Sequence, residues 1–147
     1  PSAGNRQSWE FIMIDDPKII EQLGEIKYQL NKKFSPGPGE TKKEVEERAL
    51  NQKKWFQNSS VVAVCIRSGD VGTGWLAVEN MSLAAVAEGL GSNIITYWDE
   101  EKRKVEKILA LPEDYELTCV LKFGVPGAEV TPPKRRPEFS WLHRNKF

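Results

Sequence analysis

The sequence is poor in the residues that usually carry metal or nucleophilic chemistry. It has one histidine, His143, in a basic and aromatic tail, and two cysteines, Cys65 and Cys119, far apart within apolar runs. The sequence has no Cys-x-x-Cys motif and no Cys/His cluster, so we expect no zinc site and no other metal. A Ser-His-Asp catalytic triad built on the single histidine has no support either. We expect both thiols to be reduced and buried, as in a cytoplasmic protein, with a disulfide as the alternative.

The chain also lacks an excess of charge of either sign. Lys plus Arg and Asp plus Glu are 21 each, which argues against a nucleic-acid or membrane-surface partner. No apolar run is long enough to span a bilayer. The composition that remains, 39% hydrophobic and 29% charged side chains over 147 residues, is typical of one globular domain, which we assign to residues 1–147.

Hydrophobic periodicity and capping signals predict the order of the elements. Strands are expected at 9–14, 60–66, 93–98 and 115–125, and helices at 17–30, 42–56, 75–90 and 99–109, the last capped by Asp99. Helices on both sides of a small sheet indicate an α+β, three-layer α/β/α fold with a mixed, mostly antiparallel sheet. The 75–90 segment is apolar nearly all round, so we expect a long buried central helix in which Glu79 and Asn80 are the polar exceptions and a buried carboxylate needs a partner.

Two segments depart from this regular alternation. Residues 32–58 begin with a loop of two Pro and two Gly, followed by a charged helix with a Thr41/Glu44 capping box. We interpret them as a loop–helix insertion that acts either as a lid or as surface decoration, with equal support. Residues 127–147 are expected to form an extended, Pro-rich, basic C-terminal arm.

Three separated stretches carry residue types suited to a ligand. The chain opens with PSAGNRQSWEF, whose small residues permit tight backbone and whose amides and hydroxyls both donate and accept, as the edge of a flat heterocycle requires. GLGSNIITY follows the apolar helix, where glycine lets backbone approach a ligand. PPKRRP places three cations between prolines, and an Arg fork suits a phosphate. Each stretch also has a purely structural alternative. The first would be a solvated leader, the second a helix cap followed by an ordinary strand, and the third a solubilising tail.

Together, PSAGNRQSWEF, WLAVENMSLAAVAEGLGSNIITYW, VLKFGVP and PPKRRPEFSWLHRNKF resemble, in order and context, the segments of the nitroreductase family of flavin enzymes. The resemblance covers essentially the whole chain. It implies a homodimer that binds one FMN per subunit at its interface. It also implies electron transfer from NADH or NADPH through the flavin to a nitroaromatic, a quinone or a similar small acceptor, by a ping-pong mechanism.

The resemblance also assigns roles to individual residues. It sets Ser2 and Asn5 against the isoalloxazine, with Gln7 nearby, and it lays the backbone of Ile95 and Thr96 over the flavin ring. Because the cofactor carries the hard chemistry in such enzymes, no catalytic side chain is named.

For the phosphate, the resemblance implies Arg135, with Lys134 or Arg136 as a helper. The family's other phosphate anchor, an Arg-rich motif on a first helix, has no counterpart because the sequence starts downstream of it, so we expect a domain truncated at its N-terminus. Two alternatives stay open. One is a relative with another reaction, such as flavin cleavage to a benzimidazole or dehalogenation of iodotyrosine. The other is a non-catalytic flavin-fold interaction domain.

Overall fold

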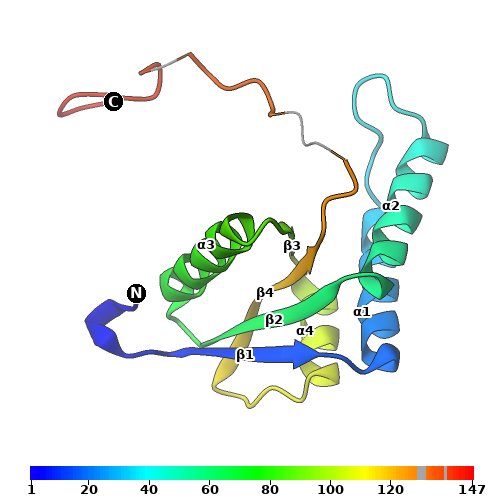
Figure 1. Cartoon of the computed structure of the whole chain (residues 1–147), viewed down its shortest axis with the longest axis horizontal. Coiled ribbons are helices and arrows are strands. Elements are labelled where there is room, and N and C mark those ends of the chain that lie inside the picture. Colours follow the sequence, from blue (N-terminus) through cyan, green and yellow to red (C-terminus); the bar gives the residue numbers. More distant parts are fainter. Residues whose placement is uncertain (129–131, 138) are drawn as a thin grey trace.

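The structure is a computed structural model that describes residues 1–128, 132–137 and 139–147. Three helices lie on one side of a sheet and one helix lies on the other (Figure 1). In chain order the elements are η1 (Ala3–Asn5), β1 (Trp9–Ile14), α1 (Pro17–Asn31), α2 (Lys42–Gln57), β2 (Ser60–Arg67), α3 (Val71–Ala87), β3 (Gly91–Ile95), α4 (Asp99–Ile108) and β4 (Tyr115–Gly124).

The sheet has four strands in the order β1-β2-β4-β3. Each pairing among the described strands is antiparallel, so the expected admixture of parallel pairing is wrong for this part of the chain. The register between β2 and β4 shifts between Val64 and Cys65. Such a bulge increases the local twist of a sheet and changes which residues stand opposite each other.

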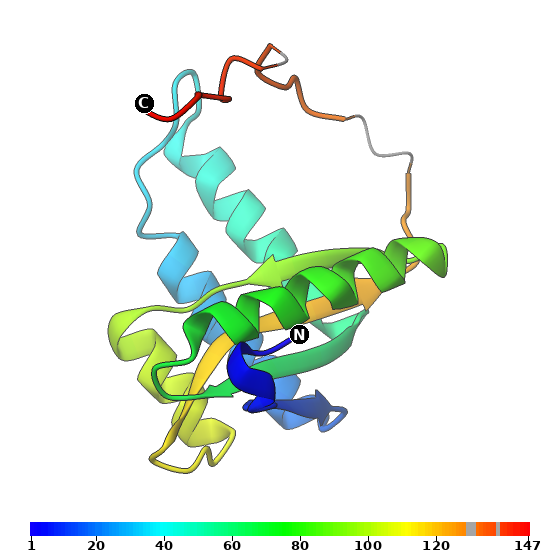
Figure 2. The ribbon, with the colours of Figure 1, turned by 90° about the vertical axis from the view of Figure 1, so that its left-hand side faces the viewer.

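The sheet is covered on both faces, which confirms the three-layer α+β prediction (Figure 2). On one face, Leu23 of α1, Phe56 of α2 and Val105 of α4 are each 0% exposed and belong to the larger core cluster. On the other face, Val78 of α3 packs in a smaller cluster with residues of β2 and β4. The alternation of side chains along each strand separates these two cores.

The sequence placed the starts of α1, α2 and α4 correctly, but it named the wrong N-cap for α4. The Asp16 carboxylate accepts a 2.8 Å hydrogen bond from the backbone of Lys18 at the start of α1, and Thr41 forms the expected capping box with Glu44. Asp99 does not cap α4: Trp98 holds that position, and Asp99 has a φ of 51°. A side chain on left-handed backbone one residue inside the helix cannot serve as its N-cap.

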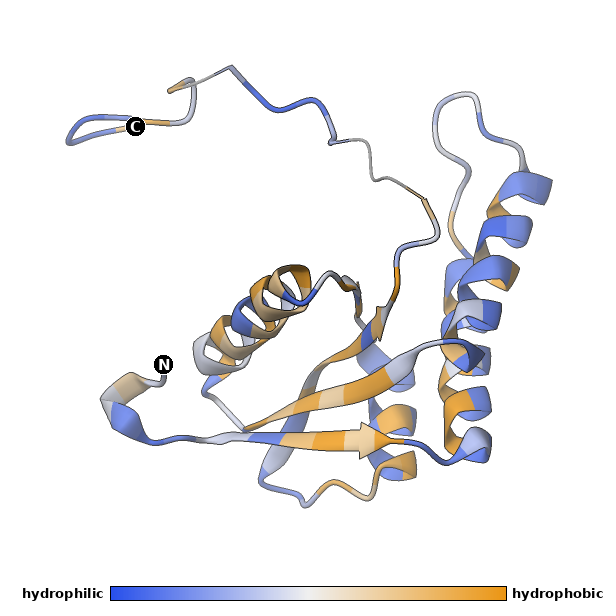
Figure 3. Ribbon diagram, in the orientation of Figure 1, coloured by the Kyte–Doolittle hydropathy of each residue, from blue (hydrophilic) through white to orange (hydrophobic). Residues whose placement is uncertain are grey.

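The prediction of a buried central helix is wrong for the single chain. In α3 only Thr73, Gly74, Val78 and Ala85 are buried. Figure 3 shows apolar residues around much of this helix, including its outward side. We call the exposed part the α3 apolar face; its large side chains are 41–69% exposed and comprise Val71, Trp75, Leu76, Leu83 and Val86. Apolar composition predicts that a surface avoids water but not whether the covering surface belongs to the same chain. Glu79 and Asn80 are also exposed, so neither needs a buried partner.

The helix of the 32–58 segment is part of the helical layer. α2 lies against α1 (Figure 1), and its Val45, Ala49 and Phe56 are buried. The Pro/Gly loop projects beyond this helix pair, and Phe34 at its start stacks on Trp98 with ring centroids 6.0 Å apart. The lid therefore stays a prediction for the loop, whereas α2 contributes to the core.

The two cysteines lie on adjacent strands but in different cores. Cys65 belongs to the cluster beneath α1, α2 and α4, and Cys119 belongs to the cluster beneath α3. Both are free and buried, as predicted. Burial raises the pKa of Cys65 to about 11 and that of Cys119 to about 12, so both are protonated thiols near neutral pH.

The described residues of the C-terminal arm extend away from the body (Figure 1). Residues 132–137 and 139–147 are exposed. Within these two stretches the ordered contacts are local, such as the 4.3 Å stacking of His143 on Phe147. None of the described helices has the length and apolarity needed to cross a membrane.

Candidate functional site

Two hollows open side by side at one end of the sheet. The first, of about 420 Å³, is lined by Arg6, Gln7, Ser8, Arg67, Ser68, Gly69, Asp70 and Tyr115. The second, of about 230 Å³, is lined by Ile66, Val71, Trp75, Thr96, Tyr97, Lys102, Glu116, Leu117 and Thr118. The two linings meet at adjacent residues in three places, which are Ile66 and Arg67 of β2, Asp70 and Val71 at the start of α3, and Tyr115 and Glu116 of β4, so the hollows are neighbours. We refer to both together as the sheet-end site.

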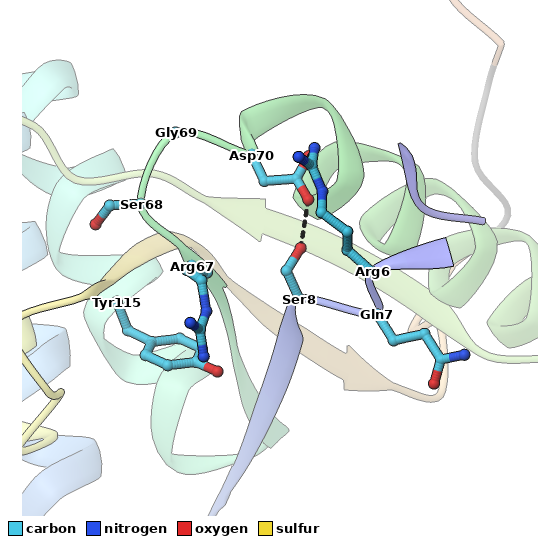
Figure 4. Close-up of a pocket in the computed structure, with 8 residues that line it drawn as sticks. All are labelled: Arg6, Gln7, Ser8, Arg67, Ser68, Gly69, Asp70 and Tyr115. Atoms are coloured by element: carbon cyan, nitrogen blue, oxygen red, sulfur yellow. Dashed lines mark hydrogen bonds and ion pairs between the residues drawn. The ribbon is translucent and has the colours of Figure 1, made fainter. Parts of the chain in front are cut away.

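Asp70 ties the opening loop to the start of α3 in the first hollow (Figure 4). Its carboxylate accepts hydrogen bonds from the hydroxyls of Ser8 and Thr73, the latter at 2.9 Å, and pairs with the Arg6 guanidinium at 3.5 Å. These contacts, led by the Ser8 hydroxyl and followed by Thr73 and then Arg6, hold the pKa of Asp70 below its usual value. The carboxylate therefore stays ionised and keeps the loop attached at neutral pH.

The rest of the first hollow is formed by the ends of two strands. The guanidinium of Arg67 lies over the ring of Tyr115, 5.5 Å from its centroid, and 3.8 Å from the carboxylate of Asp114. The backbone of Gly69 donates a 3.3 Å hydrogen bond to Glu116, which fixes the loop between β2 and α3. The hollow thus presents two guanidiniums, an ionised carboxylate and a phenol, a set suited to a polar ligand edge.

The opening loop is folded by its own predicted site residues. The Ser2 hydroxyl accepts a 3.0 Å hydrogen bond from the backbone of Gln7, and the Gln7 amide donates to the Asn5 side chain at 3.0 Å. Gly4, Asn5 and Gln7 have φ values of 57°, 54° and 51°. Left-handed backbone at non-glycine residues is uncommon and clusters at ligand sites. The structure thus brings Ser2, Asn5 and Gln7 together, and Gln7 lines the first hollow.

The segment after β3 is held by α1. Lys27 is 6% exposed, and its ammonium donates a 2.9 Å hydrogen bond to the carbonyl oxygen of Thr96. The same ammonium lies 4.7 Å from the centroid of the Trp98 ring. One turn earlier in α1, the carbonyl of Leu23 accepts a 3.0 Å hydrogen bond from the Tyr97 hydroxyl. Burial lowers the pKa of Lys27, and the carbonyl and ring compensate part of the lost hydration.

A close contact between α3 and β4 forms one wall of the second hollow. Gly74 faces Thr118 so closely that a Cβ there would overlap the Thr118 hydroxyl and lie 3.2 Å from its methyl carbon. The Thr118 Oγ1 is buried and has no hydrogen-bond partner among the described residues. Thr118 lines the second hollow, and the absence of a side chain at Gly74 lets α3 approach it this closely.

Of the other predicted site residues, Thr96 lines the second hollow but Ile95 does not. Ile95 as a whole residue is 1% exposed and packs in the larger core. Lys134 and Arg135 are exposed in the arm. Among the described contacts, no ion pair or hydrogen bond joins these cations to the sheet-end site.

The sequence reasoning did not single out Asp70, Lys27 or Arg67. A signal existed for two of them. Asp70 directly precedes an apolar helical segment, a place that favours an anchoring carboxylate. Lys27 falls four residues after Leu23, on the apolar stripe of α1, where a cation requires a partner. No pattern marked Arg67. In the described part of the chain, no group of three or more His, Cys, Asp or Glu residues is arranged for a metal ion.

Comparisons with known proteins agree with this architecture. An iodotyrosine deiodinase of Thermotoga neapolitana is 28% identical over 132 residues, covering 86% of this chain and 70% of the relative. Nitroreductase A from Vibrio parahaemolyticus superimposes with a TM-score of 0.77 at 15% identity, covering 100% of this chain and 62% of that one. An oxidised iodotyrosine deiodinase bound to FMN and 3-iodo-L-tyrosine superimposes with a TM-score of 0.75 at 23% identity, covering 100% of this chain and 80% of that one. The nitroreductase family model matches residues 1–125, and the chain belongs to this family.

Proposed function

We propose that this chain is an FMN-dependent oxidoreductase that passes electrons from NADH or NADPH to a nitroaromatic, a quinone or a similar small acceptor in a ping-pong cycle. The observation that carries the proposal is the convergence of the folded opening loop and the Thr96 segment on one end of the sheet, in a member of the nitroreductase family. Gln7 and Thr96 are 89 residues apart in sequence, so the placement of both stretches at the same end of the sheet is a property of the fold.

The residues present fit FMN by the chemistry of their donors. The opening loop offers hydroxyl and amide groups whose geometry is fixed by internal hydrogen bonds, as the polar edge of the isoalloxazine requires. Lys134 and Arg135 are exposed cations suited to the phosphate. When bound, FMN would supply hydride and electron transfer, a chemistry that no side chain can provide.

The residues of this chain would position the cofactor. Ser2, Asn5 and Gln7 would hold the polar edge of the ring system, and the backbone of Ile95 and Thr96 would lie along it. Because Lys27 binds the Thr96 carbonyl, that backbone is fixed before the cofactor arrives. A site whose donors are already oriented needs no reorganisation when charge changes on the ligand.

A homodimer would complete the site. The α3 apolar face leaves five large apolar side chains 41–69% exposed, and Phe11 and Met13 of β1 add exposed apolar surface on the same side of the sheet. Apolar patches of this kind mark interaction surfaces. A second copy packed on α3 would bury them and would allow the loop of one chain to meet the arm of the other.

The first test is the visible spectrum of the purified protein, followed by FMN titration and by NADH and NADPH oxidation with a nitroaromatic or a quinone. We expect flavin bands and acceptor-dependent consumption of one or both nicotinamides. The matched variants are Arg135→Gln, which should weaken FMN binding about 10–100-fold by removing a charge-assisted pair, and Arg103→Gln on the exposed side of α4 as a control. A protein that neither carries nor takes up FMN would refute the proposal.

Reductive deiodination is the second candidate, because the curated relative at 28% identity is an iodotyrosine deiodinase. The two reactions differ in their products. Anaerobic incubation of the dithionite-reduced protein with 3-iodo-L-tyrosine would release iodide and tyrosine if the chain is a deiodinase. Acceptor turnover with nitroaromatics and no iodide release would favour the first candidate.

A cytoplasmic location is a further part of the proposal. It rests on the cysteine content of the sequence, which has two cysteines, both free and buried, and no disulfide framework.

A further inference from the structure

Lys122 is a buried cation far from the sheet-end site. It lies on β4 and is only 3% exposed. Its ammonium lies 4.7 Å from the centroid of the Phe56 ring and 5.7 Å from that of Trp55. Tyr115, which lines the sheet-end site, is seven residues earlier on the same strand, roughly 23 Å away at ~3.3 Å per residue.

No anion faces this ammonium in the part of the chain that the structure describes. Across the sheet its neighbours are Val61 of β2 and Asn93 of β3, and from the helical layer they are Trp55 and Phe56 of α2. None of these carries a charge, and no ion pair or hydrogen bond of Lys122 is found among the described residues. Burial alone lowers its pKa, to about 8. Near neutral pH the group is therefore mostly a protonated ammonium, and among the described residues two aromatic rings face it.

Lys122 lines a cavity of about 410 Å³ at the ends of β3 and β4, within the size range of small-molecule sites. One part of its wall is apolar, with Trp55, Phe123, Val125 and Pro126. Another part is polar and uncharged, with Asn58, Ser59, Ser92 and Asn93. Lys122 is the single charged residue among the described residues that line it.

We propose that this cavity binds a small carboxylate with an aromatic or apolar body, with its carboxylate on the Lys122 ammonium and its body against Trp55. The charge selects an anion, because an anion would supply the charged partner that Lys122 does not have among the described residues. The apolar wall selects a ligand with a hydrophobic body over a bare inorganic anion. The uncharged amides and hydroxyls offer further donors to the carboxylate oxygens. This site goes beyond the proposed flavin chemistry and does not depend on it.

The test uses benzoate as the probe, benzamide as its neutral isostere, and the full chain as purified. Isothermal titration at pH 7 should give an affinity for benzoate at least tenfold greater than for benzamide. Lys122→Met, which keeps the length of the stem and removes the charge, should lower benzoate affinity at least tenfold. Lys54→Met, at an exposed lysine of the same region of α2, should leave it unchanged. The affinity of the wild-type protein for benzoate should fall by up to tenfold per pH unit above the pKa of Lys122, because the ammonium loses its charge there.

A second measurement needs no variant. Acetylation of the wild-type protein by low concentrations of acetic anhydride, mapped by mass spectrometry, should be slowed by benzoate at Lys122 and unaffected at Lys54. Equal affinity for benzoate and benzamide, or unchanged labelling of Lys122 at saturating benzoate, would overturn the proposal. So would benzoate binding that survives Lys122→Met, because it would belong to another site. None of these readouts depends on a bound flavin, so failure here and failure of the flavin proposal are distinguishable.

Discussion

The ammonium of Lys27 and the carbonyl oxygen of Thr96 are 2.9 Å apart, although 69 residues separate them in the chain. Together with the Tyr97 hydroxyl bonded to Leu23, this contact makes α1 the support of the segment that follows β3. The segment lines the second hollow of the sheet-end site, so its backbone geometry depends on a helix that lines neither hollow.

Lys27→Met should loosen this segment. The methionine keeps the apolar stem but leaves the Thr96 carbonyl without its donor, and the free energy of unfolding should fall by about 1–2 kcal/mol. Hydrogen exchange at residues 96–98 should become faster. The control is Lys18→Met, an exposed lysine at the start of α1, which should change neither quantity. Unchanged exchange at residues 96–98 in the Lys27 variant would show that the hydrogen bond does not position the segment.

Asp70→Asn should release the opening loop without unfolding the core. The amide loses the ion pair with Arg6 and one of the acceptor oxygens used by Ser8 and Thr73. We expect faster hydrogen exchange over residues 1–8, near-normal exchange in β2 and β4, and FMN affinity weakened about tenfold. Asp114→Asn, which alters the exposed pair with Arg67, is the matched control.

The same attachment should respond to acid. Since the pKa of Asp70 is lower in the folded chain than its ordinary value of 3.8, its contribution to stability is fully present above that value. It is lost as the pH falls through the folded pKa. The protection of the opening loop against hydrogen exchange, corrected for the intrinsic pH dependence of amide exchange, should therefore be constant between pH 5 and 7. It should fall below pH 4. In Asp70→Asn this acid-dependent fall should be absent.

Gly74→Ala should destabilise the chain although alanine favours helix. The new methyl overlaps the Thr118 hydroxyl, so α3 or β4 must shift, at a cost of about 1–3 kcal/mol. Gly72→Ala, where nothing lies within 4 Å, should instead stabilise by up to ~1 kcal/mol. Thr118→Ala should rescue much of the Gly74 defect in a double-mutant cycle. Additive effects would mean that the two residues do not meet as described.

Leu83→Glu should separate the proposed dimer. Leu83 is 59% exposed on the α3 apolar face, and a buried glutamate there would lack a partner. Sedimentation velocity should show a dimer for the wild type and a monomer for the variant. The control, Leu50→Glu, alters an apolar side chain of α2 that is 40% exposed, and it should remain dimeric. A wild-type monomer at all concentrations would remove the basis for a site shared between two chains.

Local signals were sufficient for most elements. The strand at 9–14 and the helix beginning at Pro17 lie where the pattern predicted, because alternation, the Asp16 cap and the proline all act within a few residues. The predicted start of α3 was four residues late, since Val71–Gly74 looks like a glycine-rich entry and was not counted as its first turn. The outward direction of its apolar face could not be read, because periodicity is lost when nearly all residues of a helix are apolar.

The candidate site was predictable only in part, because the contacts that position its residues join segments far apart in the sequence. Composition marks the opening loop, whereas Thr96 was assigned by the family resemblance, within a stretch that its glycines had singled out. The partners that position them are not marked in either way: Ser8 and Asp70 are 62 residues apart, and the two become neighbours only because β1 pairs with β2. The arm cations remain the least determined part, since the described chain gives them no partner.

The placement of the two cysteines has a consequence for oxidative stress. Cys65 and Cys119 lie on the adjacent strands β2 and β4, but their side chains project to opposite faces of the sheet. Thiols that point apart in this way cannot form a disulfide without movement of the backbone. An intramolecular crosslink between them would require the central strands to come apart first. A disulfide found after exposure of the cell or the purified protein to an oxidant would therefore be a chemical record that the molecule had unfolded.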